Sequence, residues 1–269
     1  MNYKLLVLDL DGTLTNEEKK ITQETYETLM EAQRKGLRLA LASGRPTYGI
    51  MPLAKQLEME RYGGFILAFN GAKVIECASQ DIIFERSLPQ DELSKIFEVS
   101  ERYHIPALTY EDGQIITEFP KNPYVLEESR INKLPVRQVV HLEEAVYFPP
   151  VKFLLVGDGG YLASVEGEVR EALGENFSVY RSAPFFLEVM ARGIDKARSL
   201  QRLLRHLGLD QKDLAACGDG YNDISMLEFA GFSAAMENGV PEAKKAADVI
   251  TRSNEEDGVA WFVKKYFGI

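Results

Sequence analysis

Two acidic clusters contain the side chains of this sequence that are best suited to chemistry. The first is residues 9–13, with the sequence DLDGT, and the second is residues 218–223, with the sequence GDGYND. Carboxylates held close together repel one another and have raised pKa values unless a cation lies among them. A ligand set made only of oxygen atoms favours Mg²⁺ over zinc. The two clusters together therefore predict a cation site, with Mg²⁺ as the expected ion.

Each cluster directly follows a short apolar segment that we expect to be a buried strand, residues 3–8 and residues 214–217. Alternate residues of an extended chain project to the same side, so Asp9 and Asp11 should converge at the carboxyl end of the first strand. Open α/β sheets bind their ligands at this edge. Taken singly, each cluster is also typical of a surface turn or of a helix N-cap.

The segments after the first cluster alternate between helix and strand. A helical pattern covers residues 21–35, and further buried strands are expected over 37–42 and 65–69. Residues 43–46 form a turn that leads from the second strand into another helix. This alternation is typical of a doubly wound, Rossmann-like α/β fold with a parallel sheet.

The pattern changes after the third strand. A helix is expected over 89–103, and strand-like segments follow at 106–110, 115–119, 151–156 and 177–180. Tight turns in this region favour hairpins. The alternating pattern returns after a strand over 186–190. We therefore expect a core domain made of residues 1–84 and 187–269, with an α+β domain of residues 85–186 inserted into it.

The acidic clusters occur together with Ser43-Gly44-Arg45 and with Lys196, in the order of the four motifs of the haloacid dehalogenase superfamily. The sequence resembles the Cof-type phosphatases of that superfamily, whose inserted α/β cap, of the C2B type, lies between the second and third motifs. The segment 85–186 has this position. Residues 70–72 and 236–238 also resemble short motifs of the same branch. The resemblance covers the whole chain.

The resemblance implies a phosphatase in which Asp9 attacks phosphorus and forms an aspartyl-phosphate. Asp11 would donate a proton to the leaving group and then accept one from the hydrolytic water. Mg²⁺ would bind the Asp9 carboxylate, the Asp11 backbone carbonyl and the Asp219 carboxylate, with Asp223 in a supporting shell. The ion would let an anionic nucleophile approach an anionic ester.

The resemblance also implies a set of groups that bind the phosphate. Ser43 and the Gly44 amide would hold phosphoryl oxygens at the start of a helix, although Ser43 could instead be an ordinary N-cap. Lys196 would neutralise charge on the transferred phosphoryl group, a role worth about 3 kcal/mol; otherwise it is a solvated helix lysine. Asn222 would bind a phosphoryl oxygen or orient its loop. The other expected substrate contacts are Leu10, Arg45, Asn70 and Gly71.

Two positions depart from the pattern of the family. Asp195 stands where a small polar residue is usual before the motif lysine, and Ala197 stands where glycine is usual after it. Asp195 could cap the helix and face away from the phosphate, or it could face inward and weaken phosphate binding. Gly239 replaces a common alanine, a small change for which we expect little effect.

Composition and charge exclude several classes of function. The net charge of −10 and the pI near 5.0 disfavour nucleic acid and anionic membrane surfaces as partners. The first apolar run is too short for a signal peptide or a membrane span. Cys77 and Cys217 lack the spacing of a disulfide framework or a zinc site. We expect a cytoplasmic protein, a monomer or weak homodimer, with reduced cysteines. No role is assigned to His104, His141 and His206.

The expected activity is hydrolysis of a small phosphomonoester, such as a sugar phosphate. A phosphomutase would use the same aspartyl-phosphate but should have clustered arginines in its inserted domain. The arginines of residues 85–186 are scattered. A non-catalytic sensor of phosphorylated metabolites is a further alternative, which loss of Asp9, Asp11 or Lys196 would have favoured. All three residues are present.

Overall fold

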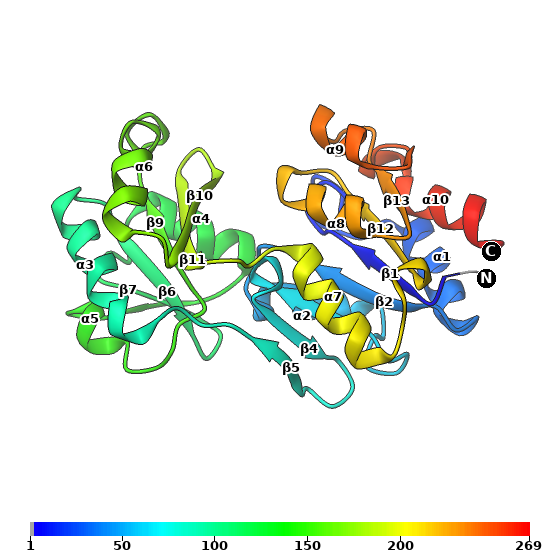
Figure 1. Ribbon diagram of the computed structural model, residues 1–269, viewed down its shortest axis with the longest axis horizontal. Coiled ribbons are helices and arrows are strands. Elements are labelled where there is room, and N and C mark those ends of the chain that lie inside the picture. The colour runs from blue at the N-terminus through cyan, green and yellow to red at the C-terminus, as the bar shows by residue number, and fades with distance from the viewer. Residues whose placement is uncertain (1–2) are drawn as a thin grey trace. The chain divides into compact units, whose positions relative to one another are not determined.

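A computed structural model describes residues 3–269 and divides them into two compact units (Figure 1). The first unit contains residues 3–84 and Asp195–Ile269, and the second contains Glu85–Ile194. The expected return to the core at residue 187 is therefore wrong. Strand β11 (Phe186–Ala191) pairs antiparallel with β9 (Lys152–Val156) and β10 (Phe177–Ala183), so it belongs to the second unit.

The first unit contains an eight-stranded sheet with the order β14-β13-β12-β1-β2-β3-β4-β5. The parallel strands are β1 (Leu5–Leu8), β2 (Arg38–Ala42), β3 (Phe65–Ala68), β12 (Leu214–Gly218), β13 (Phe232–Ala235) and β14 (Val249–Ile250). Strand β4 (Lys73–Glu76) pairs antiparallel with β3, and β5 (Ile82–Glu85) forms the edge. The expected doubly wound, mainly parallel α/β sheet is confirmed.

The order of the strands puts the acidic clusters side by side. Strand β1 is buried along its whole length and lies between β12 and β2. Leu8 is opposite Cys217 on one side and Leu41 on the other. Because the three strands are parallel, the residues that follow them emerge at the same edge of the sheet.

The helices of the first unit are α1 (Gln23–Arg34), α2 (Thr47–Gln56), α7 (Lys196–Leu207), α8 (Ile224–Phe229), α9 (Pro241–Ala246) and α10 (Gly258–Phe267). In α7 the buried side chains Leu200, Leu203 and Leu204 recur at the spacing of one helical face and pack in the core. Asp195 is its N-cap, and Gly208 ends it in a left-handed conformation. Lys196 is thereby fixed as the first residue of this helix.

The second unit contains a six-stranded sheet with the order β10-β11-β9-β6-β7-β8. The remaining strands are β6 (Ala107–Glu111), β7 (Gln114–Thr117) and β8 (Val136–Gln138), and the helices are α3 (Leu93–Arg102), α4 (Pro123–Asn132), α5 (Leu142–Ala145) and α6 (Gly159–Leu173). Along β9, Phe153 and Leu155 pack in one apolar cluster, whereas Leu154 and Val156 pack in another. The sheet of this α+β unit is therefore buried on both faces, although most of its strand pairs are antiparallel.

Two further features of the chain bear on its class. Cys77 and Cys217 are buried and free. Among the helices of residues 3–269, none combines the length and the apolar composition that crossing a bilayer requires.

Candidate active site

A buried lysine joins two of the aspartates at the edge of the sheet. Asp9 follows β1 directly, and its amide donates to the carbonyl of Cys217 on β12 at 3.0 Å. The Nζ atom of Lys196 lies 2.6 Å from Oδ1 of Asp9 and 2.5 Å from Oδ1 of Asp223. All three side chains are almost completely inaccessible to solvent. Segments far apart in the sequence thus meet in one buried ionic cluster.

Asp219 completes the cluster from the loop after β12. Carboxylate oxygens of Asp9, Asp219 and Asp223 all lie within 4.8 Å of one another. Oδ2 of Asp223 accepts hydrogen bonds from the backbone amides of Asp219 and Gly220, each at 2.9 Å. Oδ1 of Asp219 accepts from Oγ1 of Thr13 at 2.6 Å. The two acidic clusters of the sequence are therefore linked directly.

Gly12 makes this close approach of the two loops possible. Its φ is +86°, and a Cβ atom at this position would lie only 2.4 Å from Oδ2 of Asp219. Any other residue would be strained in this conformation and would also displace the Asp219 carboxylate. Gly12 is therefore required for the close packing of the Asp9–Thr13 loop against Asp219.

Burial and the excess of negative charge shift the pKa values of the cluster. Burial raises the pKa of Asp9 well above its ordinary value, and the charges of Asp223 and Asp219 act in the same direction, against Lys196. Burial raises the pKa of Asp219 to about 6. Burial alone would lower the pKa of Lys196, but Asp223 and Asp9 raise it above its ordinary value. Lys196 is therefore charged, and one ammonium group faces three carboxyl groups.

The donor set fits a hard divalent cation. Lys196 is the described side chain that binds Oδ1 of Asp9, and Thr13 is the one that binds Oδ1 of Asp219, so lone pairs of both carboxylates remain for an ion as far as the described residues show. Both oxygens of Asp223 already accept hydrogen bonds. Only oxygen atoms are offered, which suits Mg²⁺. Asp9 and Asp219 could therefore bind an ion directly, whereas the oxygens of Asp223 are engaged with protein donors.

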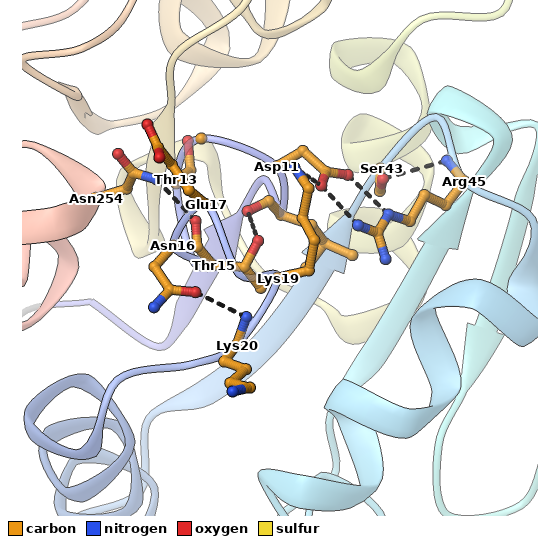
Figure 2. A network of polar contacts seen from close by, with 12 residues as sticks. Asp11, Thr13, Thr15, Asn16, Glu17, Lys19, Lys20, Ser43, Arg45 and Asn254 are labelled. Atoms are coloured by element: carbon orange, nitrogen blue, oxygen red, sulfur yellow. Dashed lines mark hydrogen bonds and ion pairs between the residues drawn. The ribbon is translucent and has the colours of Figure 1, made fainter. Parts of the chain in front are cut away.

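The Asp11 carboxylate pairs with two cations (Figure 2). Nε and Nη2 of Arg45 donate to its two carboxylate oxygens at 2.7 Å and 2.6 Å. Nζ of Lys19 lies 2.8 Å from Oδ1. Burial acts to raise the pKa of Asp11, but Arg45 and then Lys19 hold it below the ordinary value. In this conformation Asp11 is an ionised carboxylate.

Ser43 lies in the loop between β2 and α2, and it does not cap the helix. Helix α2 begins at Thr47 and its N-cap is Pro46, so the expectation that Ser43 stands at a helix start is wrong. A proline supplies no N–H group and suits this entry into a helix. The Oγ atom of Ser43 accepts a hydrogen bond from the backbone amide of Arg45 at 3.2 Å (Figure 2). An anion at Ser43 would therefore meet a loop and not the first turn of α2.

Other expected contacts lie around the same edge. Nδ2 of Asn222 donates to Oδ1 of Asn70 at 3.1 Å, which joins the loop after β12 to the loop after β3. A Cβ atom at Gly44 would lie 3.3 Å from the side chain of Asn70, and Gly71 accepts from Ser199 through its carbonyl. The side chain of Leu10 is fully buried in the core, so only its main chain could contact a substrate.

Asp195 is the N-cap of α7, and its Oδ1 accepts from the amide of Arg198 at 2.8 Å. Of the two alternatives for Asp195, the structure shows the one in which it caps the helix. Its carboxylate also pairs with the guanidinium of Arg198 at 3.2 Å. Lys19 was not expected at the site, because its contact with Asp11 depends on the path of a loop that no local pattern specifies.

The fold and the site together define an α/β enzyme with a carboxylate-rich centre, and comparison with known proteins assigns the family. A family model described as haloacid dehalogenase-like hydrolase matches residues 6–263. The chain belongs to this family, and it is a phosphatase of the haloacid dehalogenase superfamily.

Individual relatives agree with this assignment over the whole chain. A solved structure of a haloacid dehalogenase-like hydrolase from Bacteroides thetaiotaomicron superposes with a TM-score of 0.95 at 46% identity, covering 98% of this chain and 99% of the other. The subclass IIB sugar phosphatase BT4131 superposes with a TM-score of 0.83 at 28% identity, covering 99% and 100%. The 5-amino-6-(5-phospho-D-ribitylamino)uracil phosphatase YitU of Bacillus subtilis is 30% identical over 270 positions, covering 98% of each chain.

Proposed function

We propose that this chain is a Mg²⁺-dependent phosphatase that hydrolyses small phosphomonoesters, sugar phosphates among them, through an aspartyl-phosphate on Asp9. One observation carries the proposal: Lys196 holds one oxygen of Asp9 at 2.6 Å, and a carboxylate oxygen of Asp219 lies within 4.8 Å of the Asp9 carboxylate. A carboxylate held this way has one oxygen fixed and one available for attack on phosphorus. Asp9 and Asp219 would hold Mg²⁺, whose positive charge would reduce the repulsion between the anionic nucleophile and the anionic ester.

The first half of the reaction forms a bond between Oδ2 of Asp9 and phosphorus and breaks the bond between phosphorus and the ester oxygen. Lys196 remains charged because Asp223 and Asp9 raise its pKa, so it neutralises charge on the transferred group. Asn222 and Ser43 are the neutral groups suited to the phosphoryl oxygens. Asn222 is already oriented by its bond to Asn70.

Asp11 is the acid-base group of the proposal. It protonates the departing alkoxide, and in the second half it takes a proton from the water that attacks the aspartyl-phosphate. Its pairing with Arg45 favours the ionised form, which suits the second task. For the first task the pair with Arg45 has to open, and a leaving group that accepts hydrogen bonds from Arg45 would favour that opening.

The substrate class rests on two relatives and on the second unit. YitU is named for a phosphorylated ribitylamino compound and BT4131 for sugar phosphates. Both names describe phosphate esters of polyhydroxylated molecules, which agrees with a leaving group that offers oxygen acceptors. We assign substrate selection to Glu85–Ile194, because the groups at the sheet edge of the first unit are engaged with phosphate and metal.

The test is phosphate release from a panel of phosphorylated sugars, polyols, nucleotides and cofactors, with Mg²⁺ or with EDTA. Wild type should turn over part of the panel only with the metal, and Asp9→Asn should lose about 10⁴-fold or more in kcat. Exposed Asp81→Asn is the matched control and should keep wild-type activity. Metal-independent release, or an active Asp9→Asn variant, would sink the proposal. Isomerised sugar phosphate in place of free phosphate would indicate a mutase.

A further inference from the structure

Three residues near the C-terminus hold the loop that carries Asp11. Nδ2 of Asn238 donates to the carbonyl of Gly12 at 2.8 Å, and Nδ2 of Asn254 donates to the carbonyl of Thr15 at 2.9 Å. Oε1 of Glu255 accepts from the amide of Glu17 at 2.7 Å. Asn254 lies beside this loop in Figure 2. We call Asn238, Asn254 and Glu255 the clamp.

The clamp is internally braced. Oδ1 of Asn238 accepts a hydrogen bond from the backbone amide of Asn254 at 3.0 Å. Both ends of the Asn238 carboxamide are therefore used, one toward the loop and one toward Asn254. An aspartate here would keep the acceptor but would turn a second oxygen toward the Gly12 carbonyl, so the site selects an amide.

The turn that carries Asn238 also holds the second acidic loop. The amide of Val240 donates to the carbonyl of Asp219 at 2.9 Å, and a Cβ atom at Gly239 would lie 3.0 Å from that carbonyl. One turn thus contacts the backbone beside Asp11 and the backbone of Asp219. This turn therefore acts together with the bond from Thr13 to Asp219 in holding the two carboxylate loops at their spacing.

Other bonds also hold this loop, among them those from Thr13 to Asp219 and from Arg45 and Lys19 to Asp11. Leu10 accepts from the amide and the hydroxyl of Thr15, each at 2.9 Å, which closes the loop at its base. The carbonyls of Gly12 and Thr15 point outward to the two asparagines. Without these donors both carbonyls would bind water, and the loop would lose its link to the turn at Asn238.

We infer that Asn238 and Asn254 are positioning residues that set the separation between the Asp9–Asp11 loop and the Asp219 loop. The inference rests on the proposed phosphatase function for its catalytic consequence. Outer groups that orient metal-binding and catalytic side chains typically contribute 10- to 100-fold, and a displacement of about 1 Å at such a site can cost about 100-fold in rate.

The experiment compares Asn238→Ala, Asn254→Ala and the isosteric Asn238→Asp with wild type. The double variant Asn238→Asp/Glu237→Gln restores the net charge, and Glu237→Gln alone is the matched control, since Glu237 is exposed on the same turn and takes no part in the clamp. The readouts are kcat and KM on the best substrate of the panel, the dissociation constant of Mg²⁺ by calorimetry, hydrogen exchange of residues 10–20, and the melting temperature.

The expected result is a fall in kcat of about 10- to 100-fold with KM within about threefold, and Mg²⁺ binding weaker by roughly tenfold. Residues 10–20 should exchange faster, while the melting temperature stays near wild type because the two asparagines are not in the core. The charge-restored double variant should be as impaired as Asn238→Asp, and Glu237→Gln should be unchanged.

Two kinetic results, and a separate result from exchange and Mg²⁺ binding, would overturn the inference. One is a kcat within about twofold of wild type in all the asparagine variants. The other is a loss of activity that accompanies a lower melting temperature and disappears on cooling. If the wild-type protein releases no phosphate at all, the proposed function fails; unchanged exchange and Mg²⁺ binding in the variants would separately refute the clamp.

Discussion

Each unit contains a buried lysine among acidic side chains, and the two lysines are arranged differently. Lys196 lies 2.6 Å and 2.5 Å from two carboxylates at the edge of the first sheet. Lys152, on strand β9 of the second sheet, lies 3.3 Å from Glu188 and 5.4 Å from the ring centre of Tyr110. Both lysines are at least 98% buried, since their exposed fractions are 0% and 2%.

The surroundings of the two lysines differ in the balance of charge. Lys196 faces Asp9 and Asp223, with Asp219 close by. In the second unit the additional carboxylate, Glu128, accepts hydrogen bonds from two neutral donors, the hydroxyl of Tyr110 and the amide of Asn132. Burial, and then Glu128, raises the pKa of Tyr110, so the phenol remains a donor.

This difference separates a binding centre from a structural one. Lys152 pairs with Glu188, and Glu128 beside them accepts from neutral donors, whereas the single ammonium group of Lys196 faces the carboxyl groups of Asp9, Asp223 and Asp219. Buried carboxyl groups in excess of their cations destabilise the folded protein until a ligand neutralises them. We therefore expect substitutions at the first lysine to affect both chemistry and stability, and substitutions at the second to affect stability alone.

The largest effect should come from Lys196→Met. Loss of the ammonium group leaves Asp9 unoriented and the transferred phosphoryl group without this charge, so kcat/KM should fall about 100- to 1,000-fold. The uncompensated carboxylates should also lower the free energy of unfolding by about 3–5 kcal/mol at neutral pH. Steady-state kinetics and urea unfolding in EDTA measure the two effects.

Exposed Lys212 in the same unit provides the control, because Lys212→Met should leave both quantities close to wild type. A Lys196→Met variant that unfolds at the wild-type urea concentration would show that the excess of buried carboxylates does not destabilise the folded protein. The contrast with Lys152 would then disappear.

The second-largest effect is expected at Lys152, and it tests whether apolar side chains can replace the buried ion pair of Lys152 with Glu188. Lys152→Met should cost about 3–5 kcal/mol of stability, because it leaves Glu188 buried without its cation. The double variant Lys152→Met/Glu188→Met should recover most of this loss, since apolar side chains of similar size can replace a buried pair. Urea unfolding of wild type, both single variants and the double variant gives the cycle.

The kcat of the Lys152→Met/Glu188→Met variant tests whether this ion pair has a structural role alone. A purely structural pair predicts a kcat close to wild type once the protein is folded. A stable double variant with a strongly reduced kcat would instead give Lys152 or Glu188 a function, and the two buried lysines would no longer differ in kind.

The parallel core could be predicted because its strands are short apolar runs between helical segments. Strand β1, for example, is Leu-Leu-Val-Leu and is buried on both faces. Helix α6 was not expected, because its glycines at 159, 160 and 167 weaken the helical pattern. Strand β11 was expected, but its unit was not, because only the pairing with β9 decides where it belongs.

The contacts of the site likewise separate into those that the sequence could predict and those that it could not. Asp9 and Asp219 could be predicted to meet because each follows a strand of the parallel sheet, whereas Lys196 was placed with them only by the resemblance to the family. The pairing of Asp11 with Arg45 and Lys19 could not, because it depends on side-chain rotamers and on a loop. The contact of Asn238 with Gly12 joins residues far apart in the sequence, and no local pattern specifies it.

The smallest effect is the pH dependence of the metal-free protein. Burial raises the pKa of Asp219 to about 6, whereas an aspartate in the unfolded chain has a pKa near 3.9. Between these values the folded state binds more protons than the unfolded state, so this group's contribution to stability falls as the pH rises from about 4 to about 6 and is constant above. The raised pKa of Asp9 acts with the same sign, and the lowered pKa of Asp11 acts with the opposite sign.

The difference between wild type and Asp219→Asn isolates this contribution. In EDTA, the advantage of Asp219→Asn in free energy of unfolding should grow between about pH 4 and pH 6, and saturating Mg²⁺ should reverse it, because the ion binds the carboxylate of wild type. Urea unfolding at a series of pH values, with exposed Asp81→Asn as the reference, measures this difference. A difference that does not change with pH would mean that Asp219 is as well solvated as a surface carboxylate, and the charge excess that distinguishes the first unit from the second would then rest on Asp9 and Asp223 alone.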